Sequence, residues 1–166
     1  MFVQRRGFES LQFHHKIKGN IMELTDFDKR YIVGLIDEEG SIMLTRLHAN
    51  EYRRPVVSVA STTLPMLEYI TKVIGGTIVD KKVYAEHHKQ SWTWSIKGDK
   101  AIDFLAEIYP YFLEPEKRYR AKLIVQKYKA VTSRNGKYND ERRQKKEDFE
   151  RRFLSLTRII EKERKE

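Results

Sequence analysis

The chain has 166 residues, of which 40% are hydrophobic and 34% are charged, and it contains no cysteine. This length suits one domain with a sizeable core. The lack of cysteine excludes disulfides and cysteine-bound zinc, and it fits a reducing compartment such as a bacterial or archaeal cytoplasm or an organelle. No apolar run approaches the roughly 18 residues of a membrane helix, and the basic N-terminus lacks the apolar stretch of a secretory signal. We therefore expect a soluble, intracellular protein with no membrane partner.

The net charge of +9 is concentrated in two parts of the chain. Lys plus Arg against Asp plus Glu number 9 against 5 in residues 41–100 and 18 against 8 in residues 117–166. The same counts are 6 against 7 in residues 1–40 and 0 against 4 in residues 101–116. Such a basic surface predicts an anionic partner such as nucleic acid. Composition alone leaves ribosomal, regulatory and nuclease proteins open.

The first predicted elements follow residues 1–22, which lack clear periodicity. Thr25 and Asp26 are good helix N-caps, and Asp28 suits the first turn. The apolar spacing then predicts a helix over residues 27–38 that ends at Gly40. Residues 41–49 alternate in their first half, and residues 55–61 alternate with Val57 and Val59 on one face. These two segments, joined by a polar connection, are predicted to form a hairpin.

The second half of the chain repeats this pattern and then becomes helical. Residues 65–74 predict a helix that stops at Gly75-Gly76. Residues 77–84 and 91–97 predict a second hairpin across the polar loop 85–90, with Trp92, Trp94 and Ile96 on one face and Thr93 and Ser95 on the other. Further helices are predicted over residues 99–110, 116–131 and 140–164, with an Asn-Gly turn in the loop before the last.

The predicted order is helix, hairpin, helix, hairpin, helix, helix, helix. Paired strands favour an α+β fold over a parallel α/β fold. A four-stranded antiparallel sheet can place one face on helices and leave the other to solvent or a ligand. We expect an N-terminal leader over residues 1–23, a core domain over residues 24–131, and a basic helical extension of that domain over residues 132–166.

The most informative segment is residues 31–42, YIVGLIDEEGSI. Gly34 lies within an apolar helix, where glycine costs about 1 kcal/mol relative to alanine, and such a glycine often permits another backbone to approach closely. Three carboxylates follow at the helix C-terminus, where the helix dipole disfavours negative charge. A broken local rule of this kind indicates a functional site. Acidic oxygens suit a hard cation such as Mg²⁺. The alternative is a solvated acidic helix end.

Residues 32–40 closely resemble the LAGLIDADG motif, with identity at Gly34, Leu35, Ile36, Asp37 and Gly40. The resemblance covers roughly residues 24–131. It implies a LAGLIDADG homing endonuclease-like fold, in which helix, hairpin, helix, hairpin and helix build a four-stranded antiparallel DNA-binding saddle, with extra C-terminal helices here.

The resemblance also implies roles for the motif residues. In the family, the motif helices of two subunits or two repeats pack together, and the acidic residue at the eighth position binds metal. That residue is Glu39 here, with the backbone carbonyl of Glu38 as a second ligand. Asp37 is expected to be structural. The helix–helix interface would be formed by Ile32, Val33, Gly34, Ile36 and Asp37.

Only one such motif occurs in the sequence, which predicts a C2 homodimer acting on a long pseudo-palindromic site in double-stranded DNA. The family's activity is a double-strand cut that leaves 3′ overhangs. The cofactor implied is Mg²⁺, with Mn²⁺ expected to substitute for it and Ca²⁺ expected to bind without supporting cleavage.

Two further catalytic candidates come from the resemblance. Lys117 matches a family lysine near the start of the helix after the second hairpin, where it would polarise water or stabilise the charged phosphate. A phosphate-contacting or merely solvated lysine is the alternative. A polar pocket residue follows the second strand in relatives, and Ser61 is the candidate, with a register ambiguous by one residue.

The outer face of the sheet is expected to line the major groove, where a β-ribbon fits. Met43 and Leu47 would interrupt the polar face of the first strand unless a bulge shifts its register. Trp92 and Trp94 are interpreted as core residues, and His87-His88 as part of a solvated loop. The C-terminal cations, Lys145 and Lys146 included, either contact phosphates or form a charged helix face. The predicted DNA-binding residues are Ser41, Thr45, Arg46, His48, Arg53, Arg54, Ser58, Lys81, Lys82, Tyr84, Gln90, Thr93, Lys137, Arg142 and Arg143.

Three classes of function remain open at this point. The first is a metal-dependent DNA endonuclease, a phosphodiester hydrolase. The second is a binding module on the same fold, either an RNA maturase that assists intron splicing or a non-cleaving DNA-binding regulator. The third is an unrelated basic RNA-binding protein, against which the ordered pattern of elements argues. Glu39 and Lys117 favour cleavage, because a pure binding module has no need of a metal site.

Overall fold

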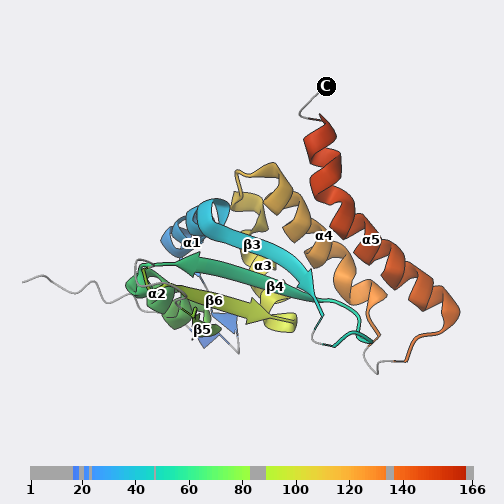
Figure 1. The fold of residues 1–166 in the computed structure, drawn as a ribbon, viewed down its shortest axis with the longest axis horizontal. Coiled ribbons are helices and arrows are strands. Elements are labelled where there is room, and N and C mark those ends of the chain that lie inside the picture. The colour runs from blue at the N-terminus through green and yellow to red at the C-terminus, as the bar shows by residue number, and fades with distance from the viewer. Residues whose placement is uncertain are drawn as a thin grey trace, which may run out of the picture.

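In a computed structural model, five α-helices and a four-stranded sheet make up most of the described chain (Figure 1). The structure describes residues 17–18, 21–22, 24–46, 48–82, 89–133 and 137–163, with the backbone alone for 17–18, 21–22 and 157–163. The elements are β1 (Ile17–Lys18), β2 (Ile21–Met22), α1 (Asp26–Glu39), β3 (Gly40–Thr45), β4 (Arg54–Ser61), α2 (Leu64–Ile74), β5 (Thr77–Asp80), β6 (Trp92–Lys97), α3 (Asp99–Ile108), the 3₁₀ helix η1 (Tyr109–Tyr111), α4 (Pro115–Val131) and α5 (Asp140–Glu163).

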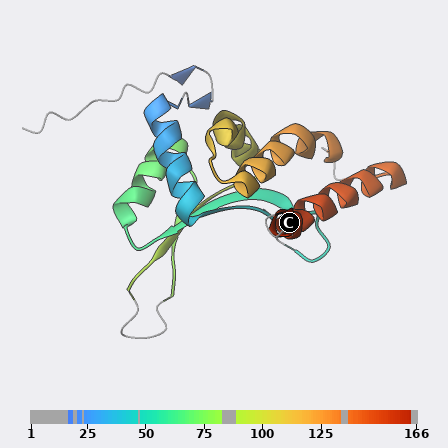
Figure 2. The same ribbon diagram turned by 90° about the horizontal axis from the view of Figure 1, so that it is seen from above.

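The sheet is antiparallel throughout, with the strand order β3-β4-β6-β5. Figure 2 shows α1, α2, α3 and α4 on one side of this sheet, with no described helix covering the other side. The α+β prediction, with its paired strands and its helices on one face, is confirmed. Among the described residues, no helix combines the length and the apolar character that crossing a bilayer requires.

Helix α1 begins with a reciprocal cap. The Thr25 hydroxyl accepts a hydrogen bond from the Asp28 amide (3.1 Å), and the Asp28 carboxylate accepts one from the Thr25 amide (3.0 Å). Two otherwise unsatisfied amides at the helix start are thereby paired. Asp28 is buried and also accepts a hydrogen bond from the Tyr69 hydroxyl of α2 at 2.5 Å. Burial, followed by this hydrogen bond, raises the pKa of Tyr69 to about 12. Local capping thus also joins α1 to α2.

The core lies between the helices and the inner face of the sheet. Val57 and Val59 face inward beside Ile96 and Trp94 of β6, as the alternating pattern predicts. The indole of Trp94 is fully buried, and its N–H donates to the carbonyl of Gly75 at 2.8 Å. The interpretation of Trp94 as a core residue is confirmed, and Trp92 beside it is half-buried.

Several element ends differ from the sequence prediction. The first strand ends at Thr45, not at residue 49, because the chain turns with a hydrogen bond from the Glu51 amide to the His48 carbonyl (3.1 Å). The strand predicted over residues 77–84 ends at Asp80, and residues 83–88, with His87 and His88, lie outside the described residues. Strand β3 is regular, so no bulge displaces Met43 from the outer face.

Helix α5 packs along α4 through Phe149, Phe153 and Leu156, which are buried. Lys146 is also fully buried there: its ammonium lies 3.8 Å from the centre of the Tyr128 ring and donates to the Thr132 hydroxyl at 2.8 Å. Neither alternative offered for Lys146, a phosphate contact or a charged helix face, fits a side chain that is enclosed by α4 and α5. Burial lowers the pKa of Lys146 to about 8, although the Glu150 carboxylate acts to raise it.

This buried lysine predicts how stability changes with pH. Between pH 8 and 10 the unfolded chain keeps the Lys146 proton, whereas the folded chain loses it, so this group makes the free energy of unfolding rise with pH. In urea unfolding at pH 7, 8, 9 and 10, we expect the wild type to gain a few kcal/mol relative to Lys146→Met. Lys145→Met is the control, because Lys145 is exposed. Equal pH dependence in all three proteins would contradict the prediction.

Candidate active site and nucleic-acid interface

Two exposed carboxylates end the first helix. Glu38 and Glu39 are the last residues of α1, and the chain passes directly into β3 at Gly40. A β-carbon on Gly40 would lie 2.6 Å from the Ile36 Cα, so only glycine permits this loop-free junction. The junction therefore places both carboxylates where the helix meets the edge strand of the sheet.

Lys117 lies against the same helix end. Its ammonium donates to the Ile36 carbonyl at 2.7 Å and to the Asp37 carbonyl. Glu114 caps α4 by accepting a hydrogen bond from the Lys117 amide (2.7 Å), which fixes where the lysine side chain starts. A cation on the last carbonyls of a helix satisfies them and offsets the helix dipole. The acidic end of α1, unfavourable by local rules, is thus compensated by α4.

Asp37 holds a neighbouring segment. One of its carboxylate oxygens accepts a hydrogen bond from the Leu113 amide at 3.0 Å. Its other oxygen is buried and has no hydrogen-bond partner among the described residues. The side chain of Leu113 is 88% exposed. This contact fits a structural role for Asp37, and it brings an exposed apolar side chain beside the motif helix.

Ser61 is the last residue of β4 and lies at the same end of the sheet as Glu39. The strand register pairs Gly40 with Val59, so Ser61 extends just past the start of β3. Its hydroxyl accepts a hydrogen bond from the Thr63 amide at 2.9 Å, which shapes the turn into α2. The fold therefore gathers the three sequence candidates Glu39, Lys117 and Ser61 at one end of the molecule.

The predicted dimer interface needs a correction. The side chains of Ile32 and Ile36 are 0% exposed and that of Val33 is 3% exposed, because they pack into the core of their own chain. A side chain with no accessible surface has none to bury against a second copy. Gly34 and Asp37, the other two predicted interface residues, are exposed and half-buried respectively.

A different stripe of α1 is open to solvent. Phe27 is 57% exposed, and its ring stacks on that of half-buried Tyr31 with a centroid distance of 6.0 Å. Gly34 follows on the same face, and a β-carbon added to it would meet nothing within 4 Å. Residues spaced by three or four positions share one side of a helix. Phe27, Tyr31, Gly34 and Glu38 therefore form an exposed stripe, which we call the seam face.

The carboxylates of one chain do not by themselves form a metal site. Among the described residues, no group of three or more His, Asp or Glu side chains lies close enough together to hold a metal ion. The exposed oxygens of Glu38 and Glu39 are nevertheless the ligand type that hard divalent cations prefer. The donor set therefore fits Mg²⁺ when a second carboxylate set or a phosphate supplies the remaining ligands.

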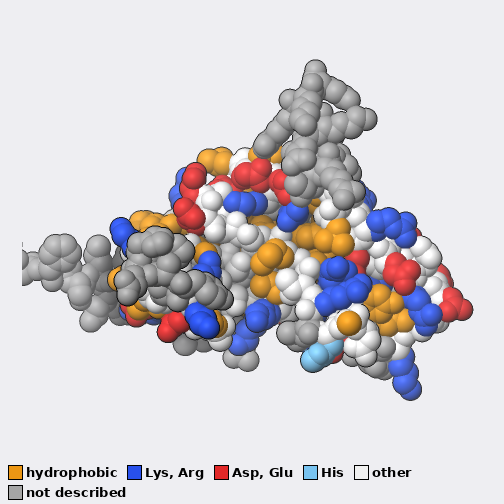
Figure 3. All heavy atoms as spheres, in the orientation of Figure 1, with side chains coloured by type: hydrophobic (Ala, Val, Ile, Leu, Met, Phe, Trp, Pro, Cys, Tyr) orange, Lys and Arg blue, Asp and Glu red, His pale blue; other side chains and the backbone are white. Residues whose placement is uncertain are grey.

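The side of the sheet opposite the helices carries mostly polar side chains, and Figure 3 shows this face with Lys and Arg side chains distributed along it. We call it the open face. The register places Ser41, Ser58 and Thr93 on it, with Thr45 opposite Arg54 at one end, as predicted. Its members are Ser41, Met43, Thr45, Arg54, Val56, Ser58, Ala60, Thr77, Val79, Thr93, Ser95 and Lys97.

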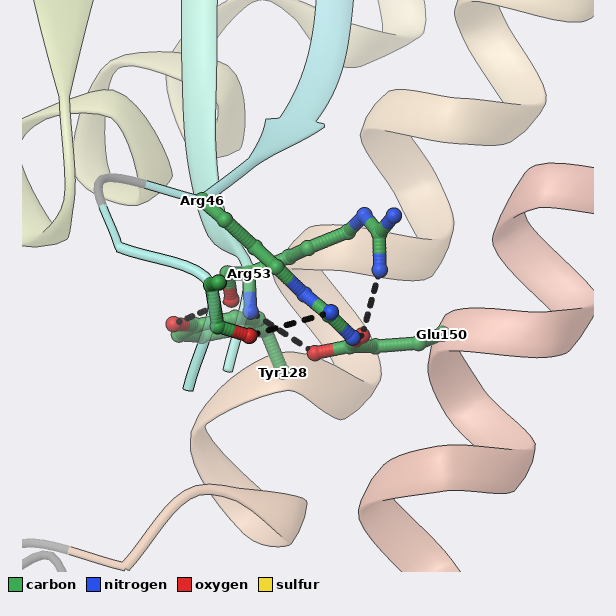
Figure 4. A network of polar contacts seen from close by, with 5 residues as sticks. Arg46, Arg53, Tyr128 and Glu150 are labelled. Carbon is green, nitrogen blue, oxygen red and sulfur yellow. Dashed lines mark hydrogen bonds and ion pairs between the residues drawn. The ribbon is translucent and has the colours of Figure 1, made fainter. Parts of the chain in front are cut away.

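Two predicted DNA-binding arginines point elsewhere. The Arg53 guanidinium lies 3.2 Å from the Glu150 carboxylate of α5, and Arg46 lies 3.7 Å from the same carboxylate (Figure 4). Side chains alternate along a strand. Thr45 and Arg54 lie on the open face, so their neighbours Arg46 and Arg53 point to the side of the sheet that the helices cover. Arg53 therefore pairs with Glu150 on the helix-facing side and keeps 28% of its side chain exposed, whereas Arg46 keeps 43% exposed. Their contacts with DNA stay predictions.

The remaining predicted contacts lie at the ends of the strands or beyond the sheet. His48, Lys81, Lys82 and Gln90 are exposed in the hairpin connections, and the Gln90 amide donates to the Lys81 carbonyl at 3.0 Å. Tyr84 lies outside the described residues. Sequence reasoning missed Lys97, an exposed cation on the open face that continuing the alternation of Thr93 and Ser95 would have found. Lys137, Arg142 and Arg143 are exposed at the start of the C-terminal helical segment.

The arrangement of these elements is the LAGLIDADG homing endonuclease fold. The homing endonuclease I-CvuI, solved in complex with its target in the presence of Ca, superposes with a TM-score of 0.56 at 19% identity over 78% of this chain and 82% of that chain. The archaeal intron-encoded homing endonuclease I-Vdi141I, complexed with DNA, superposes with a TM-score of 0.52 at 19% identity, over 79% of this chain and 84% of that chain.

A third solved structure matches over a smaller share of its length. The LAGLIDADG homing endonuclease I-GzeII, in complex with a DNA target, gives a TM-score of 0.51 at 15% identity over 77% of this chain but 43% of that chain. No protein-family model matches this sequence, and no curated protein matches it. The fold predicted from the motif is confirmed by these structures.

Proposed function

We propose that the chain is a site-specific homing endonuclease that cuts both strands of a long pseudo-palindromic DNA site as a homodimer, leaving 3′ overhangs. The observation that carries this proposal is the junction of α1 and β3. There, exposed Glu38 and Glu39 lie where the seam face, proposed to meet a second copy, adjoins the open face of the sheet, which carries cations.

The homodimer follows from the need for two catalytic ends. One chain carries one such junction, whereas cutting two DNA strands requires two. A second copy, packed against the first through α1 and related to it by a twofold axis, supplies the second junction. The match over most of I-CvuI and I-Vdi141I, compared with less than half of I-GzeII, supports a chain that amounts to one unit of the fold.

Each candidate residue has a role suited to its position. Glu39 would hold Mg²⁺ together with the Glu38 carbonyl, and the bound ion would lower the pKa of a water ligand and offset charge on the phosphate. Lys117 places its ammonium at the end of α1, where it lowers the cost of gathering two glutamates and a phosphate there. Ser61 would hydrogen-bond water or substrate at this end of the sheet. Mn²⁺ should replace Mg²⁺, and Ca²⁺ should bind without cleavage.

The proposal is tested by cleavage of unknown sites. The full chain is incubated with plasmids carrying long randomised inserts in Mg²⁺, and the new ends are captured and sequenced. We expect one family of long sites, cut on both strands with a constant 3′ overhang, and no ends with EDTA or with Ca²⁺ alone. Selection of one site family by binding, with no ends in Mg²⁺ or Mn²⁺, would replace the proposal with a DNA-binding regulator. Selective binding of RNA only would replace it with a maturase.

Lys97 provides a test of the open face as the DNA surface. Removing a phosphate contact should lower the slope of log affinity against log salt by about one for each subunit. We expect Lys97→Ala to show this change at the selected site and Lys129→Ala to show none, because Lys129 pairs with Asp103 on the helical side. Both variants lose one positive charge. Equal slopes for Lys97→Ala and Lys129→Ala, measured by fluorescence anisotropy, would exclude the open face as the contact surface.

A further inference from the structure

The connection between β3 and β4 is hydrogen-bonded to side chains of α4 and α5. The buried Glu150 carboxylate of α5 accepts hydrogen bonds from both the backbone amide (2.8 Å) and the guanidinium (3.2 Å) of Arg53. The Tyr128 hydroxyl of α4 donates to the Arg53 carbonyl at 3.2 Å (Figure 4). We call Glu150 and Tyr128 the turn clamp, because together they bind both polar backbone groups of one residue in the connection.

Burying Glu150 would be costly without compensation. A carboxylate removed from water destabilises the fold unless it is paired and hydrogen-bonded. Here the Arg53 guanidinium binds it, and Arg46, across the connection, lies 3.7 Å away. The Tyr52 ring adds a second contact, 4.6 Å from the Tyr138 ring in the segment before α5. The connection is therefore fixed at Arg53, at Arg46 and at Tyr52.

The residue after the clamped one faces the other way. Arg54 begins β4, pairs with Thr45 across the hairpin, and leaves 54% of its side chain exposed at the end of the open face. Because successive strand residues point to opposite faces, fixing Arg53 against α5 also fixes the direction in which the Arg54 side chain leaves the strand. Its guanidinium then lies 3.4 Å from the carboxylate of Glu51 in the same connection. A side chain on a mobile backbone can approach DNA in more than one geometry, whereas a side chain on a fixed backbone approaches in one.

We propose that the turn clamp determines sequence specificity at the outer part of each DNA half-site, with Glu150 as a positioning residue that acts through Arg54. This inference rests on the proposed DNA-binding function but not on cleavage. An arginine held in one geometry can distinguish a base edge, whereas a mobile one gives only charge attraction, which is independent of sequence.

The test measures equilibrium binding in Ca²⁺ to a panel of sites, each carrying one base-pair change from the selected site. Positions that lose discrimination in Arg54→Ala define the footprint of the hairpin end. We expect Glu150→Gln and Tyr128→Phe to lower discrimination about three- to tenfold at those positions, the effect of one hydrogen bond, and to leave all other positions unchanged. Asp148→Asn, a neutralised but exposed acid on α5, should match the wild type.

The outcomes separate positioning from simple stabilisation. Combining Glu150→Gln with Arg54→Ala should add nothing at the footprint positions beyond Arg54→Ala alone, since one acts through the other. A uniform loss of affinity at every position, or a fall in thermal stability with discrimination intact, would overturn the proposal. Tyr128→Phe keeps the ring beneath Lys146, so it tests the clamp even where Glu150→Gln folds poorly. A wild type that binds no specific site would refute the proposed function itself, whereas specific binding without cleavage leaves this test intact.

Discussion

Glu39→Gln is expected to reduce double-strand cleavage in Mg²⁺ by about 1,000-fold, since losing several kcal/mol of charge stabilisation has an effect of this size. Glutamine keeps the length and polarity of the side chain but loses the negative charge that would bind the ion. DNA affinity without metal should be unchanged or slightly higher, because one negative charge per subunit no longer repels the phosphates. Single-turnover cleavage and anisotropy on the same site measure the two effects separately.

The matched control is Glu38→Gln, one position earlier on the same exposed helix end. In the proposed site Glu38 contributes its backbone carbonyl, which the substitution leaves in place, so cleavage should fall by less than about tenfold. Both variants remove one exposed carboxylate from the end of α1 and change the local charge equally. A strong loss in Glu38→Gln with cleavage retained in Glu39→Gln would exchange the two assignments. Equal retention in both would remove the metal site from this helix end.

Gly34→Leu is expected to keep the fold of the single chain and to prevent dimerisation. Within one chain a β-carbon at Gly34 meets nothing within 4 Å, and leucine is a better helix former than glycine by nearly 1 kcal/mol. The thermal midpoint of the folded monomer should therefore be no lower than that of the wild-type monomer. In the dimer, a leucine on the seam face would hold two α1 helices apart, and close packing does not tolerate such a gap.

Sedimentation velocity across a concentration series measures this effect. We expect the apparent dissociation constant of the dimer to rise at least about 100-fold for Gly34→Leu, which corresponds to about 3 kcal/mol, and double-strand cleavage to fall with it. Ala106→Leu is the control, because it adds an exposed leucine to α3 on the helical side. A Gly34→Leu protein that still dimerises and cuts would show that the two copies do not meet at the seam face.

The sequence alone determined the order of the main helices and strands and the alternation of the strands, although not where every strand ends. Thr25 and Asp28 predict the start of α1, and Gly40 its end, because capping and chain reversal depend on a few neighbouring residues. The inward residues Val57, Val59 and Trp94 follow from a period of two, which a strand obeys whatever it packs against. The motif of residues 32–40 identified the fold for the same reason: its signal is local in the chain.

The tertiary structure decided which apolar side of α1 is buried. Phe27 and Tyr31 share the helical spacing of Ile32 and Ile36 and are also largely hydrophobic, so periodicity does not distinguish the exposed stripe from the core one. The difference arises from the sheet and α3, which enclose the two isoleucines, whereas Phe27 stays 57% exposed and Tyr31 half-buried. The exposed stripe of α1 could therefore be assigned only from the tertiary structure.

Long-range pairing of charges was likewise decided only by the packed fold. Lys117 reaches the carbonyls of Ile36 and Asp37 across about eighty residues of sequence, and Glu150 reaches Arg53 across ninety-seven. In the sequence Arg53 and Glu150 are ordinary members of charged segments. The motif around Lys117 marks that lysine but does not show which groups its ammonium binds. Their partners follow from three-dimensional proximity and from the energetic cost of leaving a buried charge unpaired, and neither quantity is contained in local spacing.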